Sequence, residues 1–129
     1  MKLTPNFTLQ EMTISQTAER HGIVNSPNSE QIINLKRVSA VLEVIRATID
    51  RPVMVSSGFR CETLNTAVRG SSTSKHMEGL AVDFHVDGMT PHEVIESVKH
   101  VIPYRTTVQL LPNITRFGVF MMTLIVLLI

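Results

Sequence analysis

A stripe of apolar residues near the middle of the chain constrains the fold most. Between residues 29 and 49, apolar side chains recur at steps of three and four, the spacing of one helix face, and charged residues fall between them. A cluster of turn-forming residues precedes the stripe, and Pro52 follows it. The sequence therefore predicts a core helix over roughly residues 29–49. Its apolar face consists of Ile32, Leu35, Val38, Val41, Leu42, Ile45 and Ile49.

The other recognisable elements are shorter. A capping box at residues 8–11 opens a helix that is expected to end near Gly22. A second capping box at residues 90–93 opens a helix that is expected to stop before Pro103. The remaining predicted elements are two strands at residues 53–56 and 80–86 and a short helix at residues 62–68.

Size and composition favour a single folded domain. The chain has 129 residues, of which 43% are apolar, enough to form a core. With 12 basic and 11 acidic residues, the net charge of +1 gives no reason to expect nucleic acid as a partner. Cys61 is the only cysteine, so no intrachain disulfide can form. The first residues lack the apolar run of a secretory signal, which predicts synthesis in the cytoplasm.

Two potential metal ligands lie close together in the sequence. His76 and Asp83 are separated by a short segment containing Gly79, and imidazole and carboxylate both bind zinc. On a strand over residues 80–86, Asp83 and His85 point to the same face. One interpretation is a metal site. The other is a polar turn followed by an edge strand whose polar side chains face water.

Arg60 and Ser74 are the other candidate site residues. Arg60 follows the first predicted strand, and a guanidinium can hold a carboxylate or a developing oxyanion through two parallel hydrogen bonds. The alternative is a surface arginine in a loop. Ser74 either binds substrate or orients His76, or it only caps the turn before that histidine.

Two motifs in order carry a family resemblance. The first reads S-x-H-x-x-G-x-A-x-D and the second, upstream, reads S-G-F-R followed by Asn65. Over roughly residues 5–103 the chain resembles the zinc D-alanyl-D-alanine carboxypeptidases and L-alanyl-D-glutamate endopeptidases, which cut peptidoglycan stem peptides. The resemblance implies an α+β fold, with helices packed against a small antiparallel sheet as in hedgehog-type domains. The first motif consists of Ser74, His76, Gly79, Ala81 and Asp83.

The same resemblance implies roles for individual residues. His76 and Asp83 would be two zinc ligands, and Arg60 and Ser74 would meet the substrate. In the family a third ligand, a histidine, comes from a late strand in a W-x-H or E-x-x-H setting, with a glutamate before it as general base. This chain has no tryptophan, its last histidine is His100, and its last acidic residue precedes that histidine. The third ligand and the base are thus unassigned, and His85 is the remaining candidate ligand.

The C-terminal part of the chain departs from the family pattern. We therefore divide the chain into a peptidase-like domain, residues 1–104, and a divergent apolar tail, residues 105–129. Residues 117–129 contain almost no polar side chain but are too few to span a bilayer, which takes ~20 residues in a helix. Three explanations stay open: an out-of-frame C-terminus, which we favour, a membrane-associating segment, and a genuine buried strand.

The predicted function is zinc-dependent cleavage of peptidoglycan stem peptides, or an inactive copy of such an enzyme. One alternative is a non-catalytic module that binds peptidoglycan with the same fold, and another is a small membrane-attached protein. We expect zinc as the cofactor, a stem peptide as the partner, and phage or prophage lysis of the cell wall as the context. The site of action would then be the cell wall or periplasm.

Overall fold

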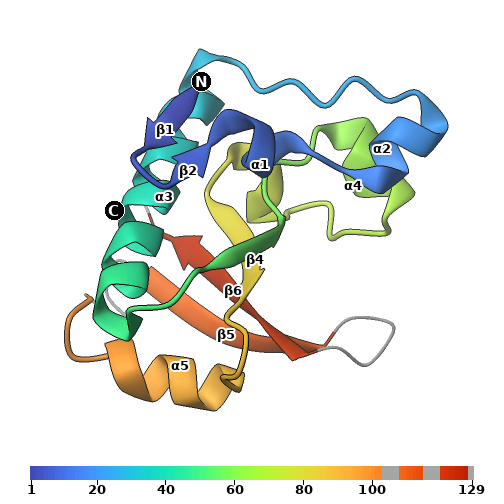
Figure 1. Cartoon of the computed structure of the whole chain (residues 1–129). Helices are drawn as coiled ribbons and strands as arrows, with labels where there is room; N and C mark the ends of the chain where they lie inside the picture. Colours follow the sequence, from blue (N-terminus) through green and yellow to red (C-terminus); the bar gives the residue numbers. More distant parts are fainter. Residues whose placement is uncertain (103–107, 115–119, 128–129) are drawn as a thin grey trace.

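The computed structural model of the chain describes residues 1–102, 108–114 and 120–127. Its long helix lies beside a twisted sheet, with shorter helices at both ends of the sheet (Figure 1). In chain order the elements are β1 (Lys2–Thr4), β2 (Phe7–Thr8), α1 (Leu9–Thr13), α2 (Gln16–His21), α3 (Ser29–Ile49), β3 (Met54–Ser57), α4 (Glu62–Ala67), the 3-10 helix η1 (Lys75–Glu78), β4 (Ala81–His85), α5 (Pro91–Val98), β5 (Val108–Ile114) and β6 (Phe120–Val126).

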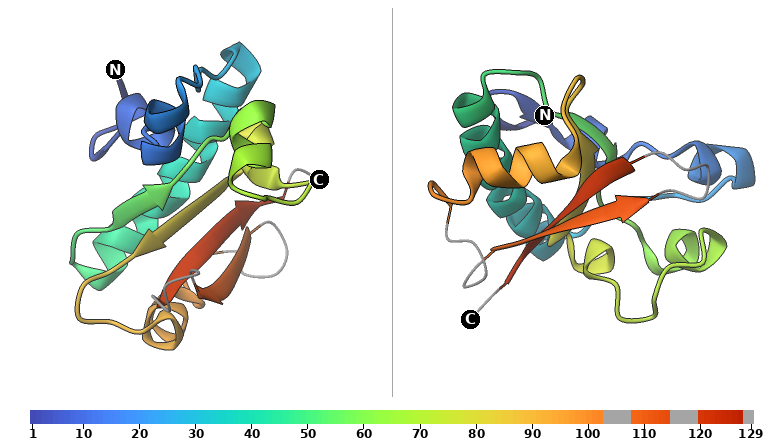
Figure 2. Two further views of the ribbon diagram at one scale, coloured as in Figure 1. Left: turned by 90° about the vertical axis from the view of Figure 1, so that its right-hand side faces the viewer. Right: turned by 90° about the horizontal axis from the view of Figure 1, so that it is seen from below.

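The main sheet has four antiparallel strands in the order β3-β4-β6-β5. Strands β1 and β2 form a separate two-stranded sheet. Helices α3 and α5 contact the main sheet through β4, β5 and β6 and lie together on one side of it (Figures 1 and 2). The predicted α+β fold, with helices packed on a small antiparallel sheet, is confirmed.

Buried apolar side chains alternate with polar side chains along the central strands, so the sheet has one face toward the core and one open face. Val82 and Phe84 of β4 are fully buried, as is Leu124 of β6. These side chains belong to the same apolar core as the inward face of α3. Because side chains alternate along a strand, Asp83 and Thr123 point to the opposite face of the sheet. That face carries the candidate site.

The helix predicted over residues 29–49 is observed as α3. It begins with a capping box between Asn28 and Gln31 and ends at Asp50, which adopts a left-handed conformation. Its buried face includes Leu35, Leu42 and Ile45, as the apolar spacing predicts.

The prediction of one helix from residue 8 to Gly22 is wrong in one respect, because the structure contains two. The backbone is extended at Ile14, which ends α1. The hydroxyl of Ser15 then accepts a hydrogen bond from the backbone N–H of Ala18 and starts α2. Gly22 ends α2 in a left-handed conformation, as expected.

Most of the described part of the apolar tail lies inside the main sheet. Strand β6 pairs with β4 through Asp83 and Thr123, among others, and β5 pairs with β6. No helix in the described ranges is long and apolar enough to cross a membrane. Strands from both sides of residue 104, β3 and β4 before it and β5 and β6 after it, belong to one sheet.

Candidate functional site

The candidate site lies where η1, β4 and the loop after β3 meet on the open face of the sheet. The backbone N–H of Arg60 donates to the carbonyl oxygen of His76 over 3.1 Å, which ties the two motifs together. Gly79 ends η1 with a φ of +76°, so the chain turns back into β4 two residues later. A side chain at Gly79 would also collide with the backbone of α3, because a Cβ there would lie 2.6 Å from the carbonyl oxygen of Gln31.

Hydrogen bonds fix the ring of His76. Its Nδ1 lies 2.8 Å from the carbonyl oxygen of Gly58. Since a carbonyl only accepts, Nδ1 carries the proton and donates. The other nitrogen, Nε2, faces Oδ1 of Asp83 at 3.4 Å. The Nδ1–H donor to a backbone carbonyl fixes the orientation of the ring, as it does in metal-binding histidines, and turns Nε2 toward Asp83.

Asp83 keeps its negative charge although only 14% of its side chain is exposed. Burial raises the pKa of this carboxyl. The hydrogen bonds from His76 and Thr123, together with the charge of Arg60, outweigh burial and lower the pKa overall. The hydroxyl of Thr123 donates to Oδ1 over 2.7 Å. The site thus contains a fixed, ionised carboxylate.

Arg60 is half-buried at the edge of the same pocket. Burial lowers the pKa of its guanidinium, and the nearby charge of Asp83 partly opposes this shift. One terminal nitrogen, NH2, donates to the hydroxyl of Ser74 over 3.2 Å. The Nε atom is buried and has no hydrogen-bond partner among the described residues. Arg60 therefore has one donor that no described residue uses.

Ser74 caps η1 as well as holding Arg60. Its hydroxyl accepts a hydrogen bond from the backbone N–H of His76 over 3.3 Å. The hydroxyl therefore caps the turn before His76, and substrate binding by Ser74 stays a prediction. Asn65, from the upstream motif, supports the intervening loop by donating to the carbonyl oxygen of Ser71 over 2.9 Å.

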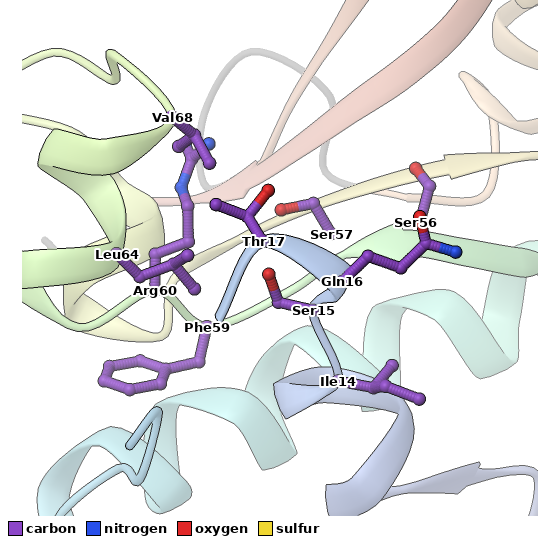
Figure 3. Close-up of a pocket in the computed structure, with 10 residues that line it drawn as sticks. All are labelled: Ile14, Ser15, Gln16, Thr17, Ser56, Ser57, Phe59, Arg60, Leu64 and Val68. Atoms are coloured by element: carbon purple, nitrogen blue, oxygen red, sulfur yellow. The ribbon is translucent and has the colours of Figure 1, made fainter. Parts of the chain in front are cut away.

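These side chains line an open pocket of about 400 Å³. The β5–β6 side of the pocket is formed by Asn113, Thr123 and Ile125. Sequence reasoning missed these three residues, because they lie in the tail that breaks the family pattern. A second pocket of about 440 Å³ adjoins Arg60, with Ser15, Thr17 and Ser57 among its lining residues (Figure 3).

The residues present do not make a complete zinc site. Catalytic zinc has three protein ligands and one open position. Within the described ranges, no group of three His, Cys, Asp or Glu side chains comes together. His85, the remaining candidate, lies on β4 but places Nε2 3.3 Å from Oδ1 of Asp87. The structure therefore brings His76 and Asp83 together and does not add His85 to them.

The fold and the site define a class of protein. A histidine and a carboxylate that face one pocket on a small antiparallel sheet, beside a half-buried arginine, are typical of a metallopeptidase domain. The family model described as Peptidase M15 matches residues 5–115, and the chain belongs to that family. The match extends past residue 104 into β5. No curated protein matches the chain.

Proposed function

We propose that this chain binds peptidoglycan stem peptides in the pocket between Arg60, His76 and Asp83. The observation that carries the proposal is the half-buried Arg60 of a peptidase M15 domain, whose Nε has no partner among the described residues. A guanidinium with free donors binds a carboxylate through paired hydrogen bonds. Stem peptides carry carboxylates at the D-glutamate and at the C-terminus, so their chemistry fits this group.

The polar groups around Arg60 can each be given a role in binding the peptide. Arg60 would hold a peptide carboxylate, and Ser74 would keep the guanidinium in place through the 3.2 Å hydrogen bond. The adjoining pocket, with hydroxyls from Ser15 and Thr17, offers polar contacts to the peptide on the other side of Arg60. The two pockets share Arg60, so an extended peptide would cross over it.

Binding without turnover is the function that the present residues support. Zinc, when bound in this family, polarises the scissile carbonyl and activates water. In the described part of this chain His76 and Asp83 offer two ligands, and no carboxylate other than Asp83 lines the pocket to act as base. We derive no catalytic step for the chain as it stands. Hydrolysis of the stem peptide is the second candidate function, favoured by the family membership.

Calorimetric titration tests the proposal. The ligands are a peptide ending in D-Ala-D-Ala and one containing L-Ala-D-Glu, with and without added zinc. We expect saturable binding that Arg60→Ala weakens about tenfold, which corresponds to about 1.4 kcal/mol. Arg51→Ala is the control, because Arg51 is exposed and its guanidinium contacts the backbone of Asp87. Equal binding by both variants would exclude Arg60 as the anchor, and product release seen by mass spectrometry would establish hydrolysis.

A further inference from the structure

Two amide side chains of α3 reach the end of η1. The Nδ2 atom of Asn34 donates to the backbone carbonyl oxygen of Glu78 over 2.8 Å. The Nε2 atom of Gln31 donates to the carbonyl oxygen of Met77 over 3.0 Å. Both carbonyls lie at the C-terminal end of η1, where the last carbonyl groups of a helix have no partner within it. Side chains 44 and 46 positions away in the sequence therefore complete the hydrogen bonding of this short helix.

We propose that Asn34 and Gln31 are positioning residues for the pocket. They hold η1, and with it His76 and Ser74, in place beside Arg60. Neither residue lines the pocket, so each acts through η1 and not by touching a ligand. Their effect on peptide binding rests on the proposed function, whereas their effect on η1 does not.

The side-chain amide of Asn34 has only one possible orientation. A terminal nitrogen of Arg37 donates to Oδ1 of Asn34 over 2.8 Å. A guanidinium has no acceptor, so the amide oxygen faces Arg37 and the amide nitrogen faces Glu78. Only 5% of Asn34 is exposed, and burial of an amide is costly unless its groups are hydrogen-bonded. Asn34 is therefore a fixed donor that points at the end of η1.

Gln31 contacts two parts of the chain through two different atoms. Its Oε1 accepts a hydrogen bond from the backbone N–H of Asn28 over 2.8 Å and so forms the capping box of α3. Its Nε2 donates to Met77 in η1. Because capping uses the oxygen and the contact with η1 uses the nitrogen, a substitution can remove one interaction and keep the other.

The remaining contacts of η1 connect it to the pocket. The carbonyl oxygen of His76 accepts the backbone N–H of Arg60, and the imidazole of His76 donates to the carbonyl oxygen of Gly58. Ser74, which caps the start of η1, accepts a hydrogen bond from the guanidinium of Arg60. A 3-10 helix of four residues is too short to be stable alone, so its neighbours fix its position. Release of its C-terminal end should therefore displace His76 and Ser74 relative to Arg60.

Gln31→Glu is the deciding variant. Its carboxylate keeps an oxygen for the N–H of Asn28, and a negative charge in the first turn of α3 is favourable toward the helix dipole. It has no N–H for the carbonyl oxygen of Met77. The variant thus keeps the cap of α3 and removes the contact with η1. Asn34→Asp has the same effect at the second contact, since its carboxylate still accepts from Arg37.

Amide hydrogen exchange, measured by NMR, reports on η1 without any ligand. The reporters are the backbone N–H groups of Arg60 and Gly79, which both donate to the carbonyl oxygen of His76. We expect each variant to speed their exchange about fivefold, the effect of losing one hydrogen bond. Exchange in β4 should rise less. Unchanged exchange at Arg60 and Gly79 would overturn the proposal, and so would an equal rise in β4, which would show only a loss of overall stability.

Peptide titration is the second readout, with the stem peptide that the unaltered chain binds more tightly. Ile45→Val is the control, because Ile45 is fully buried on the same helix but lies about 16 Å along its axis from Asn34. We expect binding about fivefold weaker in Gln31→Glu and unchanged in Ile45→Val. Equal affinity of Gln31→Glu and the unaltered chain would overturn the positioning role. If the unaltered chain binds neither peptide, the proposed function fails, and hydrogen exchange alone decides whether Gln31 and Asn34 position η1.

Discussion

Thr123 donates a hydrogen bond of 2.7 Å to Oδ1 of Asp83, the same oxygen that faces Nε2 of His76 at 3.4 Å. A hydroxyl from β6 thus binds the oxygen of Asp83 that faces His76. The bond joins the tail of the chain to the centre of the site, and it makes Thr123 the residue through which β6 can be tested.

Removing this hydroxyl should destabilise the fold. Thr123→Val keeps the shape of the side chain but leaves a buried carboxylate oxygen without its donor, which costs about 1–2 kcal/mol. Urea denaturation of the two proteins measures the difference. Thr48→Val is the matched control, since the exposed Thr48 bonds only to the carbonyl of Val44 within its own helix. A loss no greater than that of the control would mean that solvent replaces the bond.

Adding an imidazole at the same position should create a zinc site. Residues paired across an antiparallel sheet have Cβ atoms about 4.5–5.5 Å apart, so Thr123→His places a third ligand opposite Asp83. We expect zinc binding by calorimetry in T123H and none in the T123H/H76A double variant. If both variants bind zinc equally, the ion is held elsewhere and His76 is not a ligand.

Gly79 should tolerate no side chain. Its φ of +76° costs a non-glycine residue about 1–2 kcal/mol, and a Cβ would also lie 2.6 Å from the backbone oxygen of Gln31. Gly22→Ala measures the φ cost alone, because the φ of Gly22, +65°, is similar but a Cβ there would meet nothing within 4 Å. The difference between the two variants then measures the clash with Gln31. Thermal unfolding should therefore show a much larger loss for Gly79→Ala than for Gly22→Ala. Similar losses would mean that α3 moves aside at little cost.

The stability of the N-terminal hairpin should depend on pH through Glu43. Burial raises the pKa of this carboxyl, but hydrogen bonds from the backbone and side chain of Asn6, at 2.8 and 2.7 Å, lower it overall below its ordinary value of 4.5. A carboxyl whose pKa is lowered on folding contributes stability above its unfolded pKa and loses it as the pH falls through the folded value. Glu43→Gln should therefore cost less than about 1 kcal/mol at neutral pH, because water screens these exposed hydrogen bonds, and little in acid.

Urea denaturation across the acid range checks this prediction, with Asn6→Ala as the background for a double-mutant cycle. In that background Glu43→Gln should have little effect at any pH, because its partner is absent. A pH-dependent loss that persists without Asn6 would assign the effect to another neighbour of Glu43.

Local sequence signals predicted much of the scaffold. The spacing that produces α3 and the capping box before α5 involve residues close in the chain, so their geometry is visible in the sequence. The break between α1 and α2 was missed because a single side chain, Ser15, decides it. Gly79 lies between the two potential ligands in the sequence, and its positive φ shows that the chain turns there.

The β6 edge of the site could not be predicted in the same way. The contact between Thr123 and Asp83 joins residues 40 positions apart, and their pairing depends on the register of β6 against β4. The strand lacks the alternation that would have indicated its faces. His76 and Asp83 were predicted because they share a short motif. Their roles as ligands stay predictions until zinc is measured.

The inward face of β6 has a consequence for how such a gene can change. Met122 and Leu124 fill the core beside α3, so the packing of this strand does not depend on the side chains of its outward face. The strand needs apolar residues only at the alternate positions that face the core. A mutation that changes only the outward side chains of β6 therefore leaves the core packing intact, so the site can change while the chain still folds.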